Sequence, residues 1–272
     1  MILFSPAKIN LGLHILGKRE DGFHSLRSVM YPVGLCDILE FLEMPVGSEP
    51  FQFTQTGILL DQDAENNLVT KAWRLLNRET SLPPLSIHLH KQIPVGAGLG
   101  GGSSNASITL KGLNQWASPV LGPDHLQTLA IRLGSDCPFF LHTGPMMMEG
   151  RGEILSRTSL RLEGFFLVLL FPGIHISTAE AYAGVHPRVP VMTLEQQLSK
   201  TVEDWKDLLV NDFEKTVCDK YPLIRELKLA LYQAGALYAA MSGSGSSIFG
   251  IFREPPRLSR ELKKYLIWKG AA

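Results

Sequence analysis

The chain has 272 residues, and its 26 lysine and arginine side chains balance 26 aspartate and glutamate side chains, so its formal charge at neutral pH is zero. This balance argues against the classes of protein that bind nucleic acid or anionic membranes through a basic excess, and we expect neither partner. With 45% hydrophobic and 19% charged residues, the composition predicts a folded chain of one large or two modest domains.

The first predicted element is a strand over residues 7–15, because polar and apolar side chains alternate there without a break. Lys8 and Asn10 lie two positions apart, so their side chains project from the same face of this strand. A solvated sheet face is the ordinary explanation for such a pair, and the pattern alone does not separate it from a functional one.

The next segments predict a turn, short strands and a helix. Residues 19–24 form a turn that presents an aromatic side chain beside a histidine. Short strands follow over residues 35–60. The asparagine pair at 66–67 is suited to cap a helix, and residues 85–90 then alternate like a half-buried strand.

A glycine-rich segment follows that strand. Five of the seven residues from 96 to 102 are glycines, namely Gly96, Gly98, Gly100, Gly101 and Gly102. So many glycines disfavour the interior of a helix or strand. Residues 103–113 are spaced like an amphipathic helix and open with N-capping residue types. A strand, a glycine loop and a helix start place several N–H groups at the positive end of a helix dipole, so we predict phosphate binding over a flexible linker.

Two familiar phosphate-binding motifs are disfavoured. Gly96, Gly98 and Gly101 satisfy G-x-G-x-x-G, but the preceding strand alternates, whereas a parallel Rossmann strand is apolar throughout. Residues 12–18 match the first part of a Walker A motif, but Arg19 stands where serine or threonine must contact magnesium.

The rest of the chain completes an α+β pattern. We predict a helix over residues 124–133, a buried strand over 165–171, a helix over 222–235, and a second glycine-serine loop over 241–247 that joins two apolar strands as a hairpin would. Asp136 stands before Pro138 at a helix start, where the ordinary role of an aspartate is to cap the helix. The pattern predicts two domains that divide between residues 145 and 165.

The cysteines and the N-terminal residues indicate the cellular compartment of the protein. Cys36, Cys137 and Cys218 are odd in number and widely spaced, which suits neither a disulfide framework nor a zinc site, and we expect Cys137 to be a packed thiol. The N-terminus shows no signal-peptide pattern, and no apolar run approaches the ~20 residues of a membrane span. We therefore predict a cytoplasmic protein.

Three segments together resemble the GHMP kinase superfamily. They are the Pro-Ala-Lys-Ile-Asn-Leu strand at 6–11, the glycine loop at 94–106, and the Met-Ser-Gly-Ser-Gly loop at 241–245. Asp-Gly-Phe-His at 21–24 and Gly-Ser-Asp at 134–136 are similar to the branch of that superfamily that acts on 4-diphosphocytidyl-2-C-methyl-D-erythritol. The resemblance covers nearly the whole chain and keeps the order and spacing of the motifs.

The resemblance implies a fold and a reaction. It implies an α+β, two-domain GHMP kinase fold with a ribosomal-S5-like domain over residues 1–155 and a ferredoxin-like domain over 156–272. It also implies phosphorylation of the 2-hydroxyl of 4-diphosphocytidyl-2-C-methyl-D-erythritol by ATP with Mg²⁺, in the non-mevalonate route to isoprenoid precursors. Lys8 and Asp136 would be the catalytic pair. The magnesium ligands and the oligomeric state stay open.

The resemblance also implies two sets of binding residues. Those near ATP would be Asn67, Lys91, Pro94, Val95, Gly96, Ala97, Gly98, Leu99, Gly100, Gly101, Gly102, Ser103, Ser104 and Asn105. Those near the substrate would be Asn10, Phe23, His24, Thr178 and Tyr182, with the aromatic rings enclosing cytosine. Phe23 stands where this branch commonly has tyrosine, and Ser177 where it often has proline. Two alternatives remain: a different GHMP kinase, and a non-catalytic nucleotide- or RNA-binding module.

Overall fold

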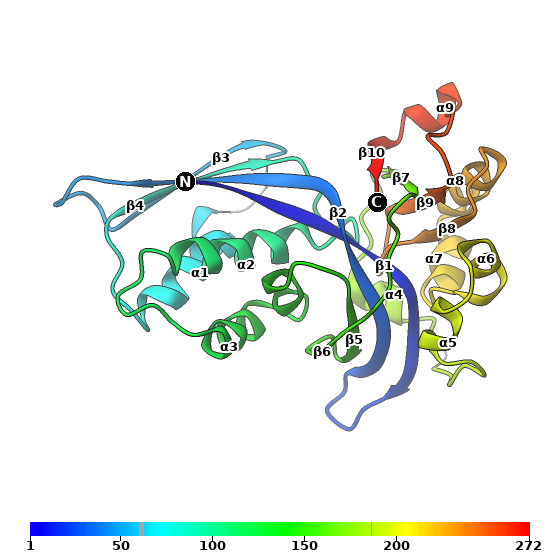
Figure 1. Ribbon diagram of the computed structural model, residues 1–272, viewed down its shortest axis with the longest axis horizontal. Coiled ribbons are helices and arrows are strands. Elements are labelled where there is room, and N and C mark those ends of the chain that lie inside the picture. Colours follow the sequence, from blue (N-terminus) through cyan, green and yellow to red (C-terminus); the bar gives the residue numbers. More distant parts are fainter. Residues whose placement is uncertain (60–62, 186) are drawn as a thin grey trace. The chain divides into compact units, whose positions relative to one another are not determined.

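The computed structural model describes residues 1–59, 63–185 and 187–272, and Figure 1 labels its helices and strands. Contacts between residues divide the chain into two compact units. Unit 1 comprises Met1–Ala7, Leu35–Val95 and Gly100–Thr143, and unit 2 comprises Lys8–Gly34, Gly96–Leu99 and Gly144–Ala272. Strands β1 (Ile2–Lys18) and β2 (His24–Glu43) contribute to both units. A domain boundary near residue 155 stays a prediction.

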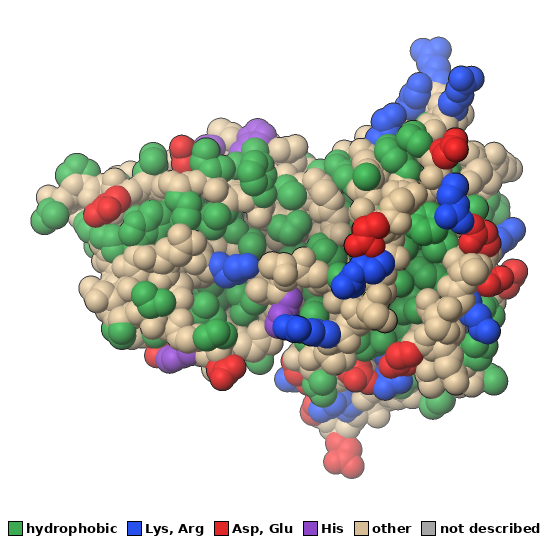
Figure 2. Space-filling view, in the orientation of Figure 1, with side chains coloured by type: hydrophobic (Ala, Val, Ile, Leu, Met, Phe, Trp, Pro, Cys, Tyr) green, Lys and Arg blue, Asp and Glu red, His purple; other side chains and the backbone are tan. Residues whose placement is uncertain are grey.

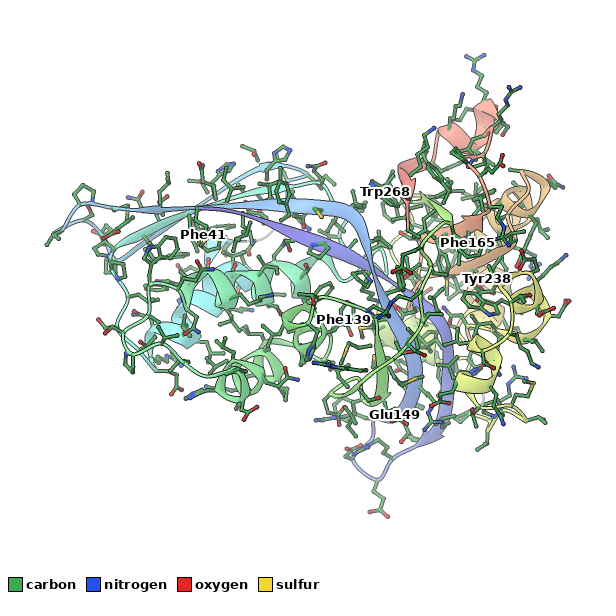
Figure 3. The ribbon with its side chains drawn as sticks, in the orientation of Figure 1. Phe41, Phe139, Glu149, Phe165, Tyr238 and Trp268 are labelled. Carbon is green, nitrogen blue, oxygen red and sulfur yellow. The ribbon has the colours of Figure 1, made fainter. Side chains whose placement is uncertain are left out.

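Unit 1 is built from a sheet and helices that cover one of its faces (Figure 1). Its strands are the first part of β1, the later part of β2, β3 (Phe51–Gly57) and β4 (Leu85–Lys91); β4 pairs antiparallel with β2 and parallel with β3. Its helices are the 3₁₀ helix Ala64–Asn66, α1 (Leu68–Asn77), α2 (Gly101–Leu113), α3 (Pro123–Leu133) and the 3₁₀ helix Cys137–Leu141. Phe41 and Phe139, labelled in Figure 3, are both buried here.

Unit 2 contains a four-stranded antiparallel sheet in the order β10-β7-β9-β8. Its strands are β7 (Phe166–Leu170), β8 (Tyr238–Met241), β9 (Ile248–Phe252) and β10 (Leu266–Ala271). The early part of β2 pairs with β5 (Met146–Gly150), which pairs with β6 (Ile154–Arg157). The helices are α4 (Thr178–Tyr182), α5 (Leu194–Leu198), the 3₁₀ helix Val202–Asp204, α6 (Trp205–Leu208), α7 (Glu214–Lys220), α8 (Pro222–Gln233) and α9 (Arg260–Lys263). Tyr238 is fully buried in this unit (Figure 3).

The predicted strands and hairpin are largely confirmed, with one correction. The strand over 7–15 lies within β1, and the loop at 241–247 joins β8 and β9 as an antiparallel hairpin. The prediction of short strands over 35–60 is wrong for residues 35–43, which belong to the 20-residue strand β2, whereas β3 is short. Pro32 and Gly34 suggest a break, but they fall between the stretch of β2 that pairs with β5 and the stretch that pairs with β4.

The helix after the glycine loop begins earlier than predicted. Its N-cap residue is Gly100, whose φ of 70° lies in the left-handed region. Ser103 and Ser104 therefore stand in the first turn of α2 and do not cap it. The serines resemble caps in sequence, but the N-cap is a glycine, which adopts positive φ without a steric penalty.

The charges on the surface and the lengths of the helices agree with the balanced charge and the short apolar runs of the sequence. On the face drawn in Figure 2, acidic and basic side chains are interspersed, and one group of basic side chains lies over α9. Within the described residues, every helix is too short or too polar to span a membrane.

Cys137 gives a prediction for alkaline stability. Burial raises the pKa of its thiol from 9.0 to about 11. The thiol in the unfolded chain therefore ionises first, so its contribution to stability is complete below pH 9 and is lost as pH rises toward 11. Two pKa units correspond to about 2–3 kcal/mol. Urea unfolding at pH 8.5 and 10.5 should show a smaller loss of unfolding free energy for Cys137→Ala than for the natural chain. Equal losses would contradict this account.

Candidate active site

Lys8 and Asn10 form a buried polar pair on β1. The Lys8 ammonium donates hydrogen bonds to Asn10 Oδ1 at 2.6 Å and to the carbonyl of Gly98 at 2.9 Å. Their side chains share a face of the strand as predicted, but the explanation as a solvated face is wrong, since the residues are only 4% and 2% exposed. A buried ammonium with fixed direction is suited to act on an anionic ligand.

Asn10 is itself held in place from β2. Its side-chain amide donates to Ser28 Oγ at 2.9 Å, and that hydroxyl donates to the carbonyl of Gly12 at 2.5 Å. The amide orientation leaves Asn10 Oδ1 to accept from Lys8. This chain of hydrogen bonds fixes the position of the Lys8 ammonium through side chains that are all buried.

The predicted ATP loop is divided between the two units. Residues 96–99 belong to unit 2, whereas 94, 95 and 100–105 belong to unit 1. In unit 2, Ser242 Oγ donates to the carbonyl of Gly98 at 2.9 Å, and the amide of Ser247 donates to the carbonyl of Ala97 at 3.1 Å. The second glycine-serine loop therefore packs directly on residues 96–99, a contact that sequence reasoning did not predict.

Asn211 is a further residue that the sequence did not single out. It is 4% exposed, and its amide donates to the carbonyls of Met241 and Gly243, each at 2.8 Å. Its Oδ1 accepts from the amide of Phe213 at 3.0 Å. Asn211 thereby fixes the loop that follows β8. The sequence signals Asn211 only through its residue type, since a side-chain amide can form hydrogen bonds with both N–H and C=O groups of the backbone.

In unit 1, the N-terminus of α2 carries the rest of the predicted phosphate loop. Gly100 provides no side-chain cap, so the first N–H groups of this 13-residue helix are not satisfied by a capping side chain. Such groups, with the helix dipole, favour an anion. The Ser104 side chain is turned inward, because its hydroxyl accepts from Ser5 Oγ at 2.8 Å and is buried.

Lys91 and Asn105 surround a buried carboxylate, Asp37. Lys91 forms an ion pair with Asp37, and Asn105 donates to Asp37 Oδ2 at 2.9 Å. Asp37 Oδ1 accepts from the amides of Gln92 and Ile93 at 2.7 and 2.8 Å. Burial lowers the pKa of Lys91, and the neighbouring carboxylate opposes that shift. Sequence reasoning missed Asp37, although a buried lysine requires such a counter-ion.

Asn67 and Asp136 both stand at helix starts. Asn67 Oδ1 accepts from the amide of Val69 at 2.9 Å and so caps α1, as the sequence predicted. Asp136 occupies the N-cap position of the 3₁₀ helix Cys137–Leu141, but its side chain makes no capping hydrogen bond. Its position therefore fits that of a helix cap, but its carboxylate does not perform the capping. Asp136 belongs to unit 1 and Lys8 to unit 2, and their pairing stays a prediction.

All five predicted substrate residues belong to unit 2. His24 stacks on Tyr182 with ring centroids 4.6 Å apart, and Thr178 is the first residue of α4, which ends at Tyr182. Phe23 is 54% exposed, and the Arg151 guanidinium lies 5.0 Å from the centroid of its ring. Arg151 was not predicted. Enclosure of cytosine by these rings stays a prediction.

The chain matches known proteins over almost its whole length. Residues 67–144 match the family described as GHMP kinases N terminal domain, and residues 194–267 match GHMP kinases C terminal. A 4-diphosphocytidyl-2-C-methyl-D-erythritol kinase of Bacteroides thetaiotaomicron is 46% identical over 93% of this chain and 92% of its own length. A protein of that name from Parabacteroides distasonis is 43% identical over 99% of each chain.

Solved structures lead to the same family. A crystal structure of 4-(cytidine 5'-diphospho)-2C-methyl-D-erythritol kinase aligns with a TM-score of 0.80 at 32% identity, covering 92% of this chain and 90% of that chain. The predicted α+β GHMP kinase fold is confirmed. This chain therefore belongs to the GHMP kinase family and, within it, to the 4-diphosphocytidyl-2-C-methyl-D-erythritol kinases.

Proposed function

We propose that this protein transfers the γ-phosphoryl group of ATP to the 2-hydroxyl of 4-diphosphocytidyl-2-C-methyl-D-erythritol, in the non-mevalonate route to isoprenoid precursors. The observation that carries the proposal is the buried Lys8 ammonium, bonded to the carbonyl of Gly98 within the glycine loop, in a chain 46% identical to a kinase of that substrate. Cys36, Cys137 and Cys218 are free thiols, which supports a reducing cytoplasm as its location.

The reaction needs alignment and charge neutralisation more than covalent chemistry. Phosphoryl transfer passes through a loose transition state with charge on the equatorial oxygens of the phosphoryl group. Lys8, the amides of residues 96–99 and the N-terminus of α2 would neutralise that charge. Asp136 would orient the 2-hydroxyl and accept its proton late, because an ionised aspartate is a weak base.

The described residues suit a magnesium ion that is held largely by phosphate oxygens. No three His, Cys, Asp or Glu side chains among them cluster as an all-protein metal site, and Mg²⁺ in kinases is usually bound by one or two carboxylates together with substrate phosphates. We assign Asp136 to this ion, because a carboxylate is the usual protein ligand of Mg²⁺ and the Ser104 side chain is fully buried. When bound, Mg²⁺ would neutralise part of the phosphate charge.

Release of ADP tests this function. The purified protein should release ADP from ATP with 4-diphosphocytidyl-2-C-methyl-D-erythritol as acceptor, and only when Mg²⁺ is present. Homoserine and mevalonate should be poor acceptors. Faster turnover of either would favour a different GHMP kinase. Absence of turnover with all three, in a protein that still binds ATP, would favour a non-catalytic nucleotide-binding module.

Tyr182 gives a prediction for substrate recognition. Its ring stacks on His24, and base–aromatic stacking is worth roughly 1–3 kcal/mol. Tyr182→Ala should raise KM for the cytidylated substrate about 10- to 100-fold and leave KM for ATP unchanged. Tyr182→Phe keeps the ring and should resemble the natural chain. An equal rise in both KM values would show general disruption instead of lost stacking.

A further inference from the structure

Unit 2 contains a cavity of about 730 Å³ that is separate from the residues discussed so far. Its wall includes none of the residues assigned to ATP, to the substrate or to catalysis. The wall is formed by Met147, by residues 156–161, by Phe165, by Glu195 and residues 198–203, and by Trp205 and Arg253. Its volume lies within the range of small-molecule sites.

The wall carries a net positive charge in a chain that has none overall. Its charged residues are Arg157, Arg161, Lys200, Arg253, Glu195 and Glu203. Both carboxylates have arginine partners: Glu203 pairs with Arg253, and Glu195 lies 3.7 Å from Arg27. The positive charges are therefore only partly compensated within the wall.

Arg157 and Lys200 carry the uncompensated charge. Among the residues that the structure describes, neither forms an ion pair with a carboxylate, whereas Arg161 lies 3.8 Å from Glu163. An arginine and a lysine on the wall of one cavity favour a phosphate group as the ligand.

The remainder of the wall is suited to the carbon part of a ligand. Phe165 and Leu198 contribute apolar surface with Trp205 packed behind them, and the hydroxyls of Ser156 and Ser159 add polar groups. Trp205 is only 1% exposed and therefore belongs to a packed wall instead of a mobile surface. A bare phosphate ion would leave the apolar part of this wall without a partner.

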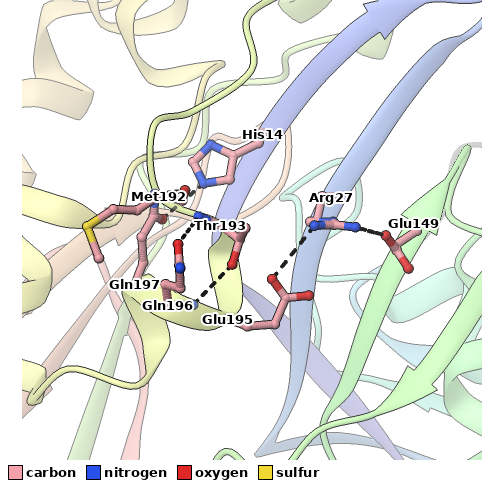
Figure 4. A network of polar contacts seen from close by, with 8 residues as sticks. All are labelled: His14, Arg27, Glu149, Met192, Thr193, Glu195, Gln196 and Gln197. Atoms are coloured by element: carbon pink, nitrogen blue, oxygen red, sulfur yellow. Dashed lines mark hydrogen bonds and ion pairs between the residues drawn. The ribbon is translucent and has the colours of Figure 1, made fainter.

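Polar contacts between α5 and strands β1 and β2 hold this part of the wall in place (Figure 4). Thr193 and Gln196 form a reciprocal capping box at the start of the helix, and Gln197 contacts His14 Nε2 on β1 at 3.1 Å. Arg27 on β2 bridges Glu195 and Glu149. The cavity is thus largely formed before a ligand arrives, which reduces the entropy lost on binding.

We propose that this cavity binds a small organic phosphate, with Arg157 and Lys200 contacting the phosphate and the apolar wall contacting the organic group. The site is distinct from the one that binds ATP and substrate, and the proposal does not depend on the kinase reaction.

Hydrogen-exchange mass spectrometry with phenyl phosphate tests the site, because protection is read separately for each segment. Phenyl phosphate should protect residues 156–161 and 198–205 of the full chain, whatever it does at residues 94–105. The double variant Arg157→Gln/Lys200→Gln should need at least a tenfold higher concentration for the same protection. Inorganic phosphate should protect these segments more weakly than phenyl phosphate.

The matched control removes equal charge elsewhere. Arg260→Gln/Lys263→Gln on α9 lies outside the cavity and should bind phenyl phosphate as the natural chain does. Thermal unfolding of both double variants checks that they are folded. The proposal is overturned if the natural chain shows no protection at 156–161 and 198–205, or if the two double variants bind equally well. Equal protection by inorganic phosphate also overturns it.

Discussion

Replacing Lys8 with methionine is expected to lower turnover about a thousandfold while the protein remains folded. Methionine keeps an unbranched apolar stem and removes only the ammonium that Asn10 and Gly98 hold in place. Loss of one preorganised group that stabilises transition-state charge typically lowers kcat 10²- to 10³-fold. The carbonyl of Gly98 keeps a donor in Ser242, so the cost in stability should be about 1–3 kcal/mol for the Asn10 oxygen that loses its partner. ADP release and thermal unfolding measure the two effects.

The pairing of Lys8 with Asp136 is tested by the double variant. If the two groups act on one transition state as a unit, Lys8→Met/Asp136→Asn should be little slower than the slower single variant. If the two groups have independent roles, the losses of turnover in the single variants should multiply in the double variant, and that result would contradict the pairing. Lys8→Arg is the matched control for charge. It keeps the cation but replaces a compact ammonium with a wider planar group, so it should recover only part of the turnover.

The elements that the sequence predicts well are those with a local pattern. Alternation in β1 is sufficient to place Lys8 and Asn10 on one face, because side chains two positions apart on a strand always share a face. Asn67 is also recognisable from the local sequence as the cap of α1, because its side-chain oxygen accepts from an amide only two residues away. These predictions need no knowledge of the tertiary fold.

The parts of the site that were missed depend on partners distant in the chain. Asp37 is 54 residues from Lys91, and Asn211 is 30 residues from the Met241 carbonyl that it binds. Neither residue belongs to a local motif. The start of α2 differs from the prediction for another reason: serine is a common cap, and only the backbone conformation of Gly100 marks where the helix begins. Tertiary packing therefore decides the roles of Asp37 and Asn211, whereas the start of α2 depends on the local backbone conformation of one glycine.

Gly98 is the position where a single methyl group should do the most damage. Its φ of 77° is a left-handed conformation that costs an L-residue roughly 1–2 kcal/mol. A Cβ there would stand 2.0 Å from the carbonyl oxygen of Ser242 and 3.0 Å from that of Gly245. Both are backbone atoms, so no side-chain rotation relieves the overlap, and the two glycine loops must separate.

Gly98→Ala should therefore displace the carbonyl that both Lys8 and Ser242 bind. We expect turnover to fall at least a hundredfold and the free energy of unfolding to fall by about 2–4 kcal/mol, as measured by ADP release and urea unfolding. Gly144→Ala is the control, because a Cβ at Gly144 meets no atom within 4 Å and its φ lies outside the left-handed region. Near-natural turnover in Gly98→Ala would mean that contact between the two loops is not needed to place the Lys8 ammonium.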